Sequence, residues 1–190
     1  MMKRYLYVSM LVSSLLLLVP GLEAQEIVHA LCGTVSSINP AAGTITLFQD
    51  SGSPATFKVM SATGKRITFD KKIADDVTAA KQFQKQGAYA ILFYYGVNEN
   101  QTAVALKNLG AGPFSSTTGQ VTDWSGHDRK LSVRDKDGVT HSFTIAPQTV
   151  AETYTGVEDG TKLDLNKGDS VRVVSSRTGD APTALFIRER

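Results

Sequence analysis

Apolar and polar residues alternate in short runs over residues 33–59. Ile45 and Leu47 alternate with Thr44 and Thr46, and turn-forming residues separate this run from its neighbours. A period of two places apolar side chains on one face of a strand and polar side chains on the other. Each strand should therefore bury one face and expose the other. The pattern predicts strands near residues 33–38, 44–47 and 57–59.

The same pattern recurs 86 residues later without a gap. Five residues are identical at this offset, namely Gly33, Val35, Gly52, Phe57 and Thr63 with Gly119, Val121, Gly138, Phe143 and Thr149. A second block recurs at an offset of 81, in which Gly87, Thr102 and Ala103 match Gly168, Thr183 and Ala184. Repetition at a fixed spacing indicates a duplicated unit. We expect two tandem copies of one small β module, with extra residues between the two blocks of the first copy.

A helix is expected between the third and fourth strands of the first copy. Ile73, Val77, Ala80 and Phe83 recur there at helical spacing, between Asp70 as N-cap and Gly87 as C-terminal stop. Three strands, a helix or loop and two more strands is the order of the OB-fold, a five-stranded Greek-key barrel.

The predicted fold class is therefore mainly β, with two tandem five-stranded OB-like barrels, the first with a short α-helix. Strands four and five are expected near 89–95 and 102–106 in the first barrel, and near 170–176 and 183–187 in the second. The expected divisions are a first module at 25–109, a linker at 110–118 and a second module at 119–190.

The N-terminus has the three parts of a secretory signal peptide. Lys3 and Arg4 precede an apolar run at residues 6–19, and the small residue Ala24 marks an expected cleavage site. The run is too short for a membrane span, which needs roughly 20 apolar residues. We therefore expect residues 1–24 to be removed, and the protein to be exported to a periplasm or the cell exterior without a membrane span.

The charge and the cysteine content of the chain limit which partners and which covalent links are expected. Removing Lys3, Arg4 and Glu23 from the 20 basic and 18 acidic residues leaves 18 and 17, so the mature chain is almost neutral. Such a chain lacks the cationic field that nucleic acid binding requires, so no nucleic acid partner is expected. Cys32 is the only cysteine, which excludes an intramolecular disulfide. A buried inert thiol and an intermolecular disulfide both stay open.

The second copy resembles an uncharacterised family of small β-barrel domains found in exported bacterial proteins. The residues that carry the resemblance are Gly119, Val121, Gly138, Thr149, Gly168, Asp169, Val171 and Ala184. The first copy departs from the pattern, with Ala88 and Ala90 where the family has Asp and Val. The resemblance implies a fold and an exported location, and it implies no catalytic residues.

The fourth strand of the first copy carries an apolar stripe where the second copy is mostly polar. Its outward face is expected to hold Tyr89, Ile91, Phe93 and Tyr95. Large exposed apolar patches usually mark contacts, so this stripe is the candidate contact surface. The sequence leaves four alternatives for what covers this stripe: the first module's helix, the other barrel, a partner protein or a glycan. Burial of Tyr89 and Phe93 within the monomer would exclude the external partner.

The sequence nominates no catalytic residue, no metal site and no cofactor. Asp135 to Gly138 resemble the start of a calcium loop, but the later ligands are missing. His127 and His141 lack the spacing of zinc ligands. No nucleophile elbow or phosphate loop is present, so we expect no enzyme.

Two function classes follow, and a third is weaker. The first is a non-enzymatic exported binding or assembly module with a protein-contact surface on the first barrel, for which the partner would be an envelope protein. The alternative is an oligosaccharide-binding OB-like module of the cell envelope. A hydrolase would require acidic residues that converge only in the folded chain. Self-association stays open.

Overall fold

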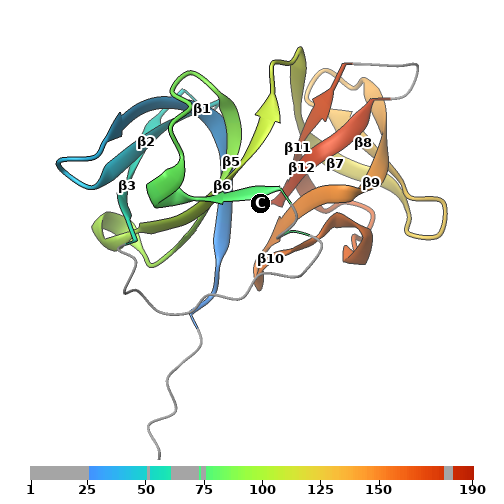
Figure 1. Cartoon of the computed structure of the whole chain (residues 1–190). Helices are drawn as coiled ribbons and strands as arrows, with labels where there is room; N and C mark the ends of the chain where they lie inside the picture. The colour runs from blue at the N-terminus through green and yellow to red at the C-terminus, as the bar shows by residue number, and fades with distance from the viewer. Residues whose placement is uncertain (1–25, 51, 61–72, 74–75, 178–181) are drawn as a thin grey trace, which may run out of the picture.

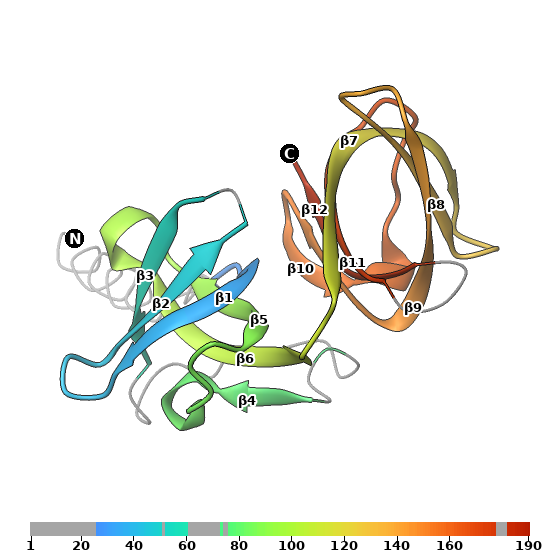
Figure 2. The same ribbon diagram turned by 90° about the horizontal axis from the view of Figure 1, so that it is seen from above.

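The computed structural model describes residues 26–50, 52–60, 73, 76–177 and 182–190. The expected signal peptide, Asp70 and Thr63 lie outside these residues. Within the described part of the chain, no helix has the length and apolar character that a membrane crossing requires. Two curled sheets lie side by side, one built from each half of the chain (Figures 1 and 2).

The first sheet closes into a five-stranded barrel with one extra strand. Its hydrogen-bonded order is β3-β2-β1-β5-β6, and β3 pairs with β6 to close the ring, while β4 adds to the outer edge of β6. The strands are β1 (His29–Asn39), β2 (Thr44–Gln49), β3 (Pro54–Val59), β4 (Val77–Ala79), β5 (Tyr89–Tyr95) and β6 (Thr102–Gly110). Two 3₁₀-helices, η1 (Ala80–Gln82) and η2 (Asn98–Asn100), lie in its connections.

The second sheet closes in the same order. β8, β7, β11, β12 and β9 form the ring, β9 pairs with β8, and β10 adds to the edge of β9. The strands are β7 (Phe114–Ser125), β8 (Lys130–Asp135), β9 (Thr140–Thr153), β10 (Gly156–Asp159), β11 (Ser170–Ser176) and β12 (Thr183–Glu189), with 3₁₀-helix η3 (Gly160–Lys162) after β10. The expected OB-like barrels are thus present in both halves.

The residue pairing is equivalent in the two barrels. Ile45 lies opposite Phe57 in the first barrel, and Leu131 lies opposite Phe143 in the second. The first strand of each barrel also has an irregularity at the same place, directly after Val35 and after Val121. The offset of 86 residues therefore predicts register as well as strand positions. That the two halves arose by duplication stays a prediction.

Glycine is required where the first strand of each barrel crosses the second. A Cβ atom on Gly33 would lie 2.4 Å from the carbonyl oxygen of Phe48, and one on Gly119 would lie 2.0 Å from that of Arg134. Both oxygens are backbone atoms, so they cannot move aside as the end of a flexible side chain could. The Gly-x-Val pattern therefore marks a close approach between two strands.

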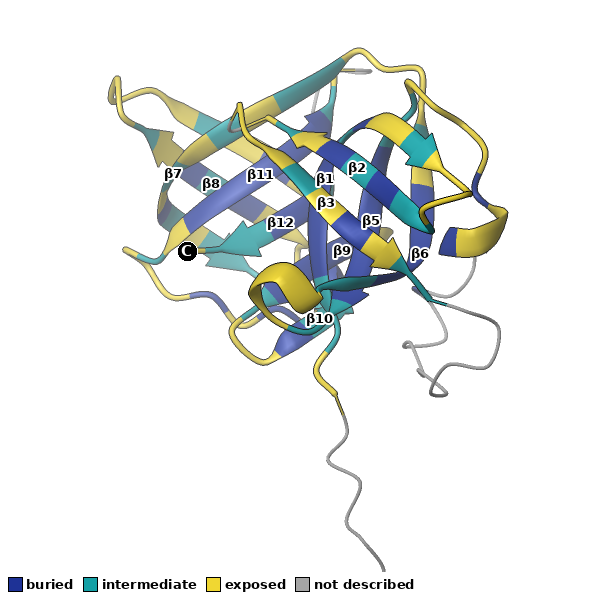
Figure 3. Cartoon of the chain, turned by 90° about the vertical axis from the view of Figure 1, so that its left-hand side faces the viewer, coloured by how far each residue is buried: buried dark blue, intermediate teal, exposed yellow. Residues whose placement is uncertain are grey.

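Each barrel encloses its own apolar core, and a third core lies between the barrels. Phe57 is fully buried in the first core, and Phe143 is 4% exposed in the second. The third core joins side chains of both modules; we call it the junction core. Its buried members are Ala30, Cys32, Ile73, Ile91, Phe93, Val104, Ala105, Val150, Val174 and Phe186. The two strands that meet there, β5 and β11, are buried over most of their length (Figure 3).

The short helix expected between the third and fourth barrel strands is present at Ile73, but it does not extend to Val77 as the spacing predicted. Val77–Ala79 form β4, which pairs antiparallel with β6, and Ala80–Gln82 form η1. Ala80 and Phe83 pack in the first barrel core and Val77 packs against the junction core, so residues of a strand and a 3₁₀ turn produce the helix-like spacing. Residues 70–72, 74 and 75 of the predicted helix lie outside the described residues.

The connection between the modules is shorter than the expected linker at 110–118. β6 ends at Gly110 and β7 begins at Phe114, so only Ala111 to Pro113 lie between the two strands. The Ser and Thr residues that suggested a linker are strand residues, paired with β11.

Phe57→Ala and Phe143→Ala test whether the two cores are equivalent. Each change removes a buried ring from the same place in its barrel, so each should lower the free energy of unfolding by about 3–5 kcal/mol. Phe48→Ala is the matched control, because Phe48 is 47% exposed and its loss should cost less than about 0.5 kcal/mol. Urea denaturation measures all three. Unequal losses for the two buried rings would contradict equivalent cores.

Candidate binding grooves at the junction of the barrels

The apolar stripe on β5 is covered by the second module. Ile91 and Phe93 are both 0% exposed, and they belong to the junction core with Val174 and Phe186 of the second module. Tyr89 and Tyr95, at the ends of the strand, are half-buried against the same core. This corrects the expectation of an external contact surface: the stripe buries its apolar area against the other barrel.

Asp50 ties the two modules together at one end of β5. Its Oδ2 accepts a hydrogen bond from the Tyr89 hydroxyl at 2.5 Å and another from Nη2 of Arg172 in β11. Nε of Arg172 donates to Oγ of Ser116 at 3.0 Å. The Tyr89 ring also stacks on Phe114 of β7, with ring centroids 4.7 Å apart. Burial raises the pKa of Tyr89, and Cys32 and Asp50 raise it further, so the phenol stays protonated and donates to the carboxylate.

Cys32 lies within the junction core. Its side chain is 1% exposed, and burial raises the pKa of its thiol to about 12. Thiolate is the reactive form of cysteine, so this thiol is unreactive while the barrels stay together. Of the two alternatives left by the sequence, the buried inert thiol is the one the structure supports, because an outside thiol has no access to it.

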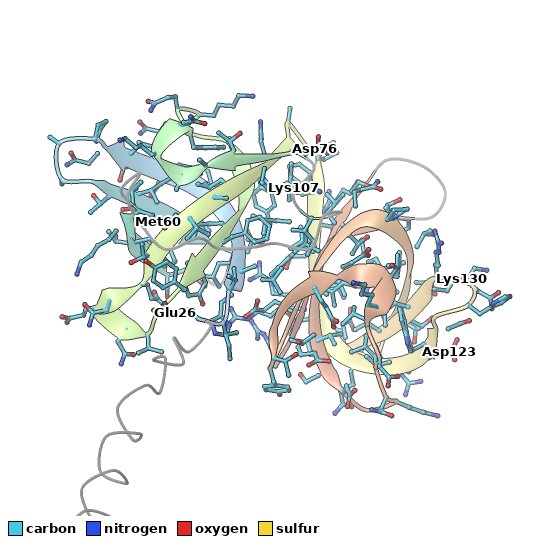
Figure 4. All side chains as sticks on the ribbon, turned by 60° about the horizontal axis from the view of Figure 1, so that its bottom comes forward. Glu26, Met60, Asp76, Lys107, Asp123 and Lys130 are labelled. Atoms are coloured by element: carbon cyan, nitrogen blue, oxygen red, sulfur yellow. The ribbon has the colours of Figure 1, made fainter. Side chains whose placement is uncertain are left out.

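Glu152 ties the modules together at the other end of β5. Its Oε1 lies 2.8 Å from Nδ1 of His29, and its Oε2 accepts from the backbone N–H of Ala30, also at 2.8 Å. Close by, the N–H of Val157 in β10 donates to the Val28 carbonyl at 2.9 Å. Lys107 of β6, labelled in Figure 4, donates from Nζ to the carbonyl of Gln148. Polar contacts thus surround the junction core.

One groove, of about 630 Å³, runs along the junction beside Glu152; we call it the Tyr154 groove. Val97 and Tyr154 line this groove, and they are 71% and 77% exposed. Val97 precedes η2 of the first module, whereas Tyr154 lies in the turn between β9 and β10 of the second. The groove is lined by His29, Tyr94, Gly96, Val97, Asn98, Gln101, Glu152, Thr153, Tyr154, Arg188, Glu189 and Arg190.

A second groove, of about 540 Å³, lies beside Asp50 and the first half of β7; we call it the β7 groove. Its lining is mostly hydroxyl and charged groups, with Arg172 at 6% exposure among them. The lining residues are Asp50, Ser115, Ser116, Thr117, Thr118, Asp135, Lys136, Asp137, His141, Arg172 and Arg190. Residues of both modules line both grooves, although Asp50 is the first module's contribution to the β7 groove.

Asp135 uses its carboxylate within its own hairpin. Oδ1 accepts from the N–H groups of Asp137 and Val139 at 2.9 Å each, and Oδ2 lies 2.8 Å from Nε2 of His141. The hydrogen bond to His141 is the largest cause that lowers the pKa of Asp135. His127 is exposed in the turn after β7. Within the described ranges, no group of three or more His, Cys, Asp or Glu side chains is placed to hold a metal ion.

Sequence reasoning missed most of the residues that form the grooves. Glu152, Arg172 and Arg188 come from the second module and meet residues of the first module that are far away in sequence. No local pattern marks them. A signal was available for Tyr154, which is an aromatic residue between two threonines in a turn.

No protein-family model and no curated protein sequence matches the chain. Solved structures of CusF are similar to it. The crystal structure of Ag(I)CusF is 19% identical with a TM-score of 0.31, over 41% of this chain and 99% of that chain. CusF-Ag(I) residues 10–88 from Escherichia coli gives 19% and 0.33, over 43% and 96%. Apo-CusF residues 6–88 from Escherichia coli gives 19% and 0.33, over 44% and 94%. The first two of these structures are of the Ag(I) form of CusF, and the third is of the apo form.

Glu152→Gln tests the burial of the carboxylate at the junction. Burial is the largest cause that raises the pKa of Glu152 above its ordinary 4.5, although His29, Ala30 and Arg188 lower it. The folded state therefore holds this proton more tightly than the unfolded state. Its contribution to stability is fully present below about pH 4.5 and is lost as the pH rises through the raised pKa.

The glutamine variant lacks this titration and keeps an oxygen for the Ala30 N–H. The difference in unfolding free energy, wild type minus variant, should therefore fall as the pH rises above about 4.5 and through the raised pKa, as measured by denaturant unfolding at each pH. Glu158 and Glu189, whose pKa values burial also raises, are common to both proteins and cancel. Parallel pH profiles would show that Glu152 titrates normally.

Proposed function

We propose that the protein is a non-enzymatic, exported binding module whose ligand lies in the Tyr154 groove. One observation carries the proposal. Val97 and Tyr154 are the two most exposed large apolar side chains of the described residues, and both stand at this groove. They come from different modules. Exposed apolar side chains gathered around a cleft favour a binding site, because a soluble protein gains nothing by leaving them in water.

The rest of the lining supplies hydrogen bonds for a polar ligand. Asn98 and Gln101 offer amide groups, and Arg188 offers a guanidinium group. Glu152 also lines the groove, and its carboxylate already contacts His29 and the Ala30 N–H. Two arginines and two glutamates line the groove, which does not favour a strongly charged ligand.

An oligosaccharide is the candidate ligand that this lining favours. Tyr154 offers an exposed ring on which a sugar can stack, and planar amide and guanidinium groups pair with hydroxyl groups. Residues 96–101 are the connection between the fourth and fifth barrel strands, β5 and β6. The equivalent loop of OB-folds takes part in binding oligosaccharides. A protein ligand in the same groove is the competing candidate.

Export and the lack of catalysis are supported by the sequence. The leader predicts export, and no catalytic motif occurs in the chain. With the stripe on β5 covered, the grooves replace it as the surface through which a binding module would act.

Tyr154→Ala tests the groove and the ligand class together. A glycan array finds the ligand, and titration calorimetry then compares the wild type with the variant. Loss of the ring should weaken glycan binding about threefold to tenfold, since an aromatic contact contributes about 0.5–1.5 kcal/mol. Phe48→Ala removes an exposed ring outside the groove and should bind as the wild type does.

Equal affinity in the two variants would remove the groove from the proposal. An array without binders, together with envelope proteins captured by the wild type but not by Tyr154→Ala, would replace the oligosaccharide with a protein ligand.

A further inference from the structure

The first half of β7 is paired on one side only. Phe114 to Thr118 pair with β11, and pairing with β8 starts at Gly119 and continues to Ser125. β8 ends at Asp135, directly opposite Gly119, and the chain turns away there. Within the described residues, no strand pairs with the other edge of Phe114 to Thr118. This open edge lies in the β7 groove.

The pairing with β11 determines which backbone groups face the open edge. Arg177 donates its N–H to the carbonyl of Pro113, so odd-numbered residues of β7 exchange hydrogen bonds with β11. In an antiparallel pair the residues between them direct both backbone groups to the opposite side. Phe114, Ser116 and Thr118 therefore direct their N–H and C=O groups into the groove. Ser116 and Thr118 are exposed.

The same edge of the first module is already satisfied. Ala30 occupies the position on β1 that Ser116 occupies on β7, and it lies opposite Phe93 as Ser116 lies opposite Val174. The Ala30 N–H donates to Glu152, and the Val28 carbonyl accepts from strand β10. The second module thus covers the edge of the first with a strand and a carboxylate. Among the residues that the structure describes, neither a strand nor a carboxylate covers the equivalent edge of β7.

We propose that the open edge of β7 binds an extended peptide segment of another protein as an added strand. An unpaired edge is a template for strand addition, in which backbone hydrogen bonds give affinity. The edge has no proline and no bulge between Phe114 and Thr118 to prevent pairing. Its position in a groove, beside Asp50 and the Asp135–Asp137 turn, suits one strand of a peptide. Proteins commonly bind ligands in clefts of roughly this volume.

The neighbouring residues define the chemistry of the peptide. Lys136, Asp137 and Arg190 line the groove together with hydroxyl groups of β7, so the peptide's side chains that face them are polar. The segment contains no proline at positions that pair, because each of these must supply an N–H. The site is separate from the Tyr154 groove, and it does not depend on the ligand proposed there.

Amide hydrogen exchange of the free protein tests the open edge without a ligand. The N–H groups of Ser116 and Thr118 should exchange more than about a hundredfold faster than that of Thr117, which is bonded to β11. The N–H of Ala30 should exchange slowly, because Glu152 accepts it. Slow exchange at Ser116 and Thr118 in a monomer would overturn the proposal. Slow exchange in a dimer, with mass measured by light scattering, would assign the edge to a second copy instead.

Thr118→Pro and Thr118→Ala then test peptide binding. A displayed library of random heptapeptides is selected on the full mature protein, and synthetic versions of the selected peptides are titrated into each variant. Proline removes the N–H that faces the groove but no bond to β11, and edge strands tolerate proline at such a position. Thr118→Pro should bind at least about tenfold more weakly than Thr118→Ala, which also lacks the Thr118 hydroxyl but keeps the N–H.

Thermal unfolding of both variants confirms that they are folded. Equal binding by Thr118→Pro and Thr118→Ala would overturn strand addition. So would a library that yields no peptide protecting the Ser116 and Thr118 amides from exchange. If Tyr154→Ala binds these peptides normally, the two sites are independent, and failure of one proposal leaves the other standing.

Discussion

Burial of apolar side chains between the two barrels is the interaction on which the rest of the structure depends. Ile91 and Phe93 of β5 meet Val174 and Phe186 of the second module with no exposed surface. Asp50 and Glu152 then fix the two ends of this contact, one through Arg172 and one through His29 and Ala30. Residues of both modules line both grooves, with several from the first module in the Tyr154 groove and Asp50 in the β7 groove.

The repeat in the sequence predicted the strands, their register and the two barrel cores. Phe57 and Phe143 show why, since both are core residues opposite equivalent partners. Local spacing extended the predicted helix between β3 and β5 too far, because apolar residues on a short strand and a 3₁₀ turn can imitate the period of a helix. The offset of 86 residues aligns Arg129 with Gly43, but the residue type does not show that Arg129 adopts the same left-handed conformation as the glycine.

The candidate sites were harder to predict than the fold. The contrast between the copies singled out β5, but a pattern of residues does not tell what covers an apolar face. The other barrel covers the apolar face of β5, and the two grooves and the open edge of β7 lie around the margins of this contact. The open edge also depends on a difference between the two modules. β10 joins β9 in the second module while β4 joins β6 in the first, so equivalent strand edges have different neighbours. Within the described residues, the edge of β1 at Ala30 is covered by the second module, whereas the edge of β7 at residues 114–118 has no paired strand.

Cys32 gains a practical meaning from its place in the junction core. It is the chain's single thiol, and it is shielded by contacts that belong to both modules. A maleimide can alkylate it only after the halves part, so the labelling rate reports how often they separate in solution. The native cysteine can therefore serve as a probe for separation of the two barrels, and no engineered probe is needed.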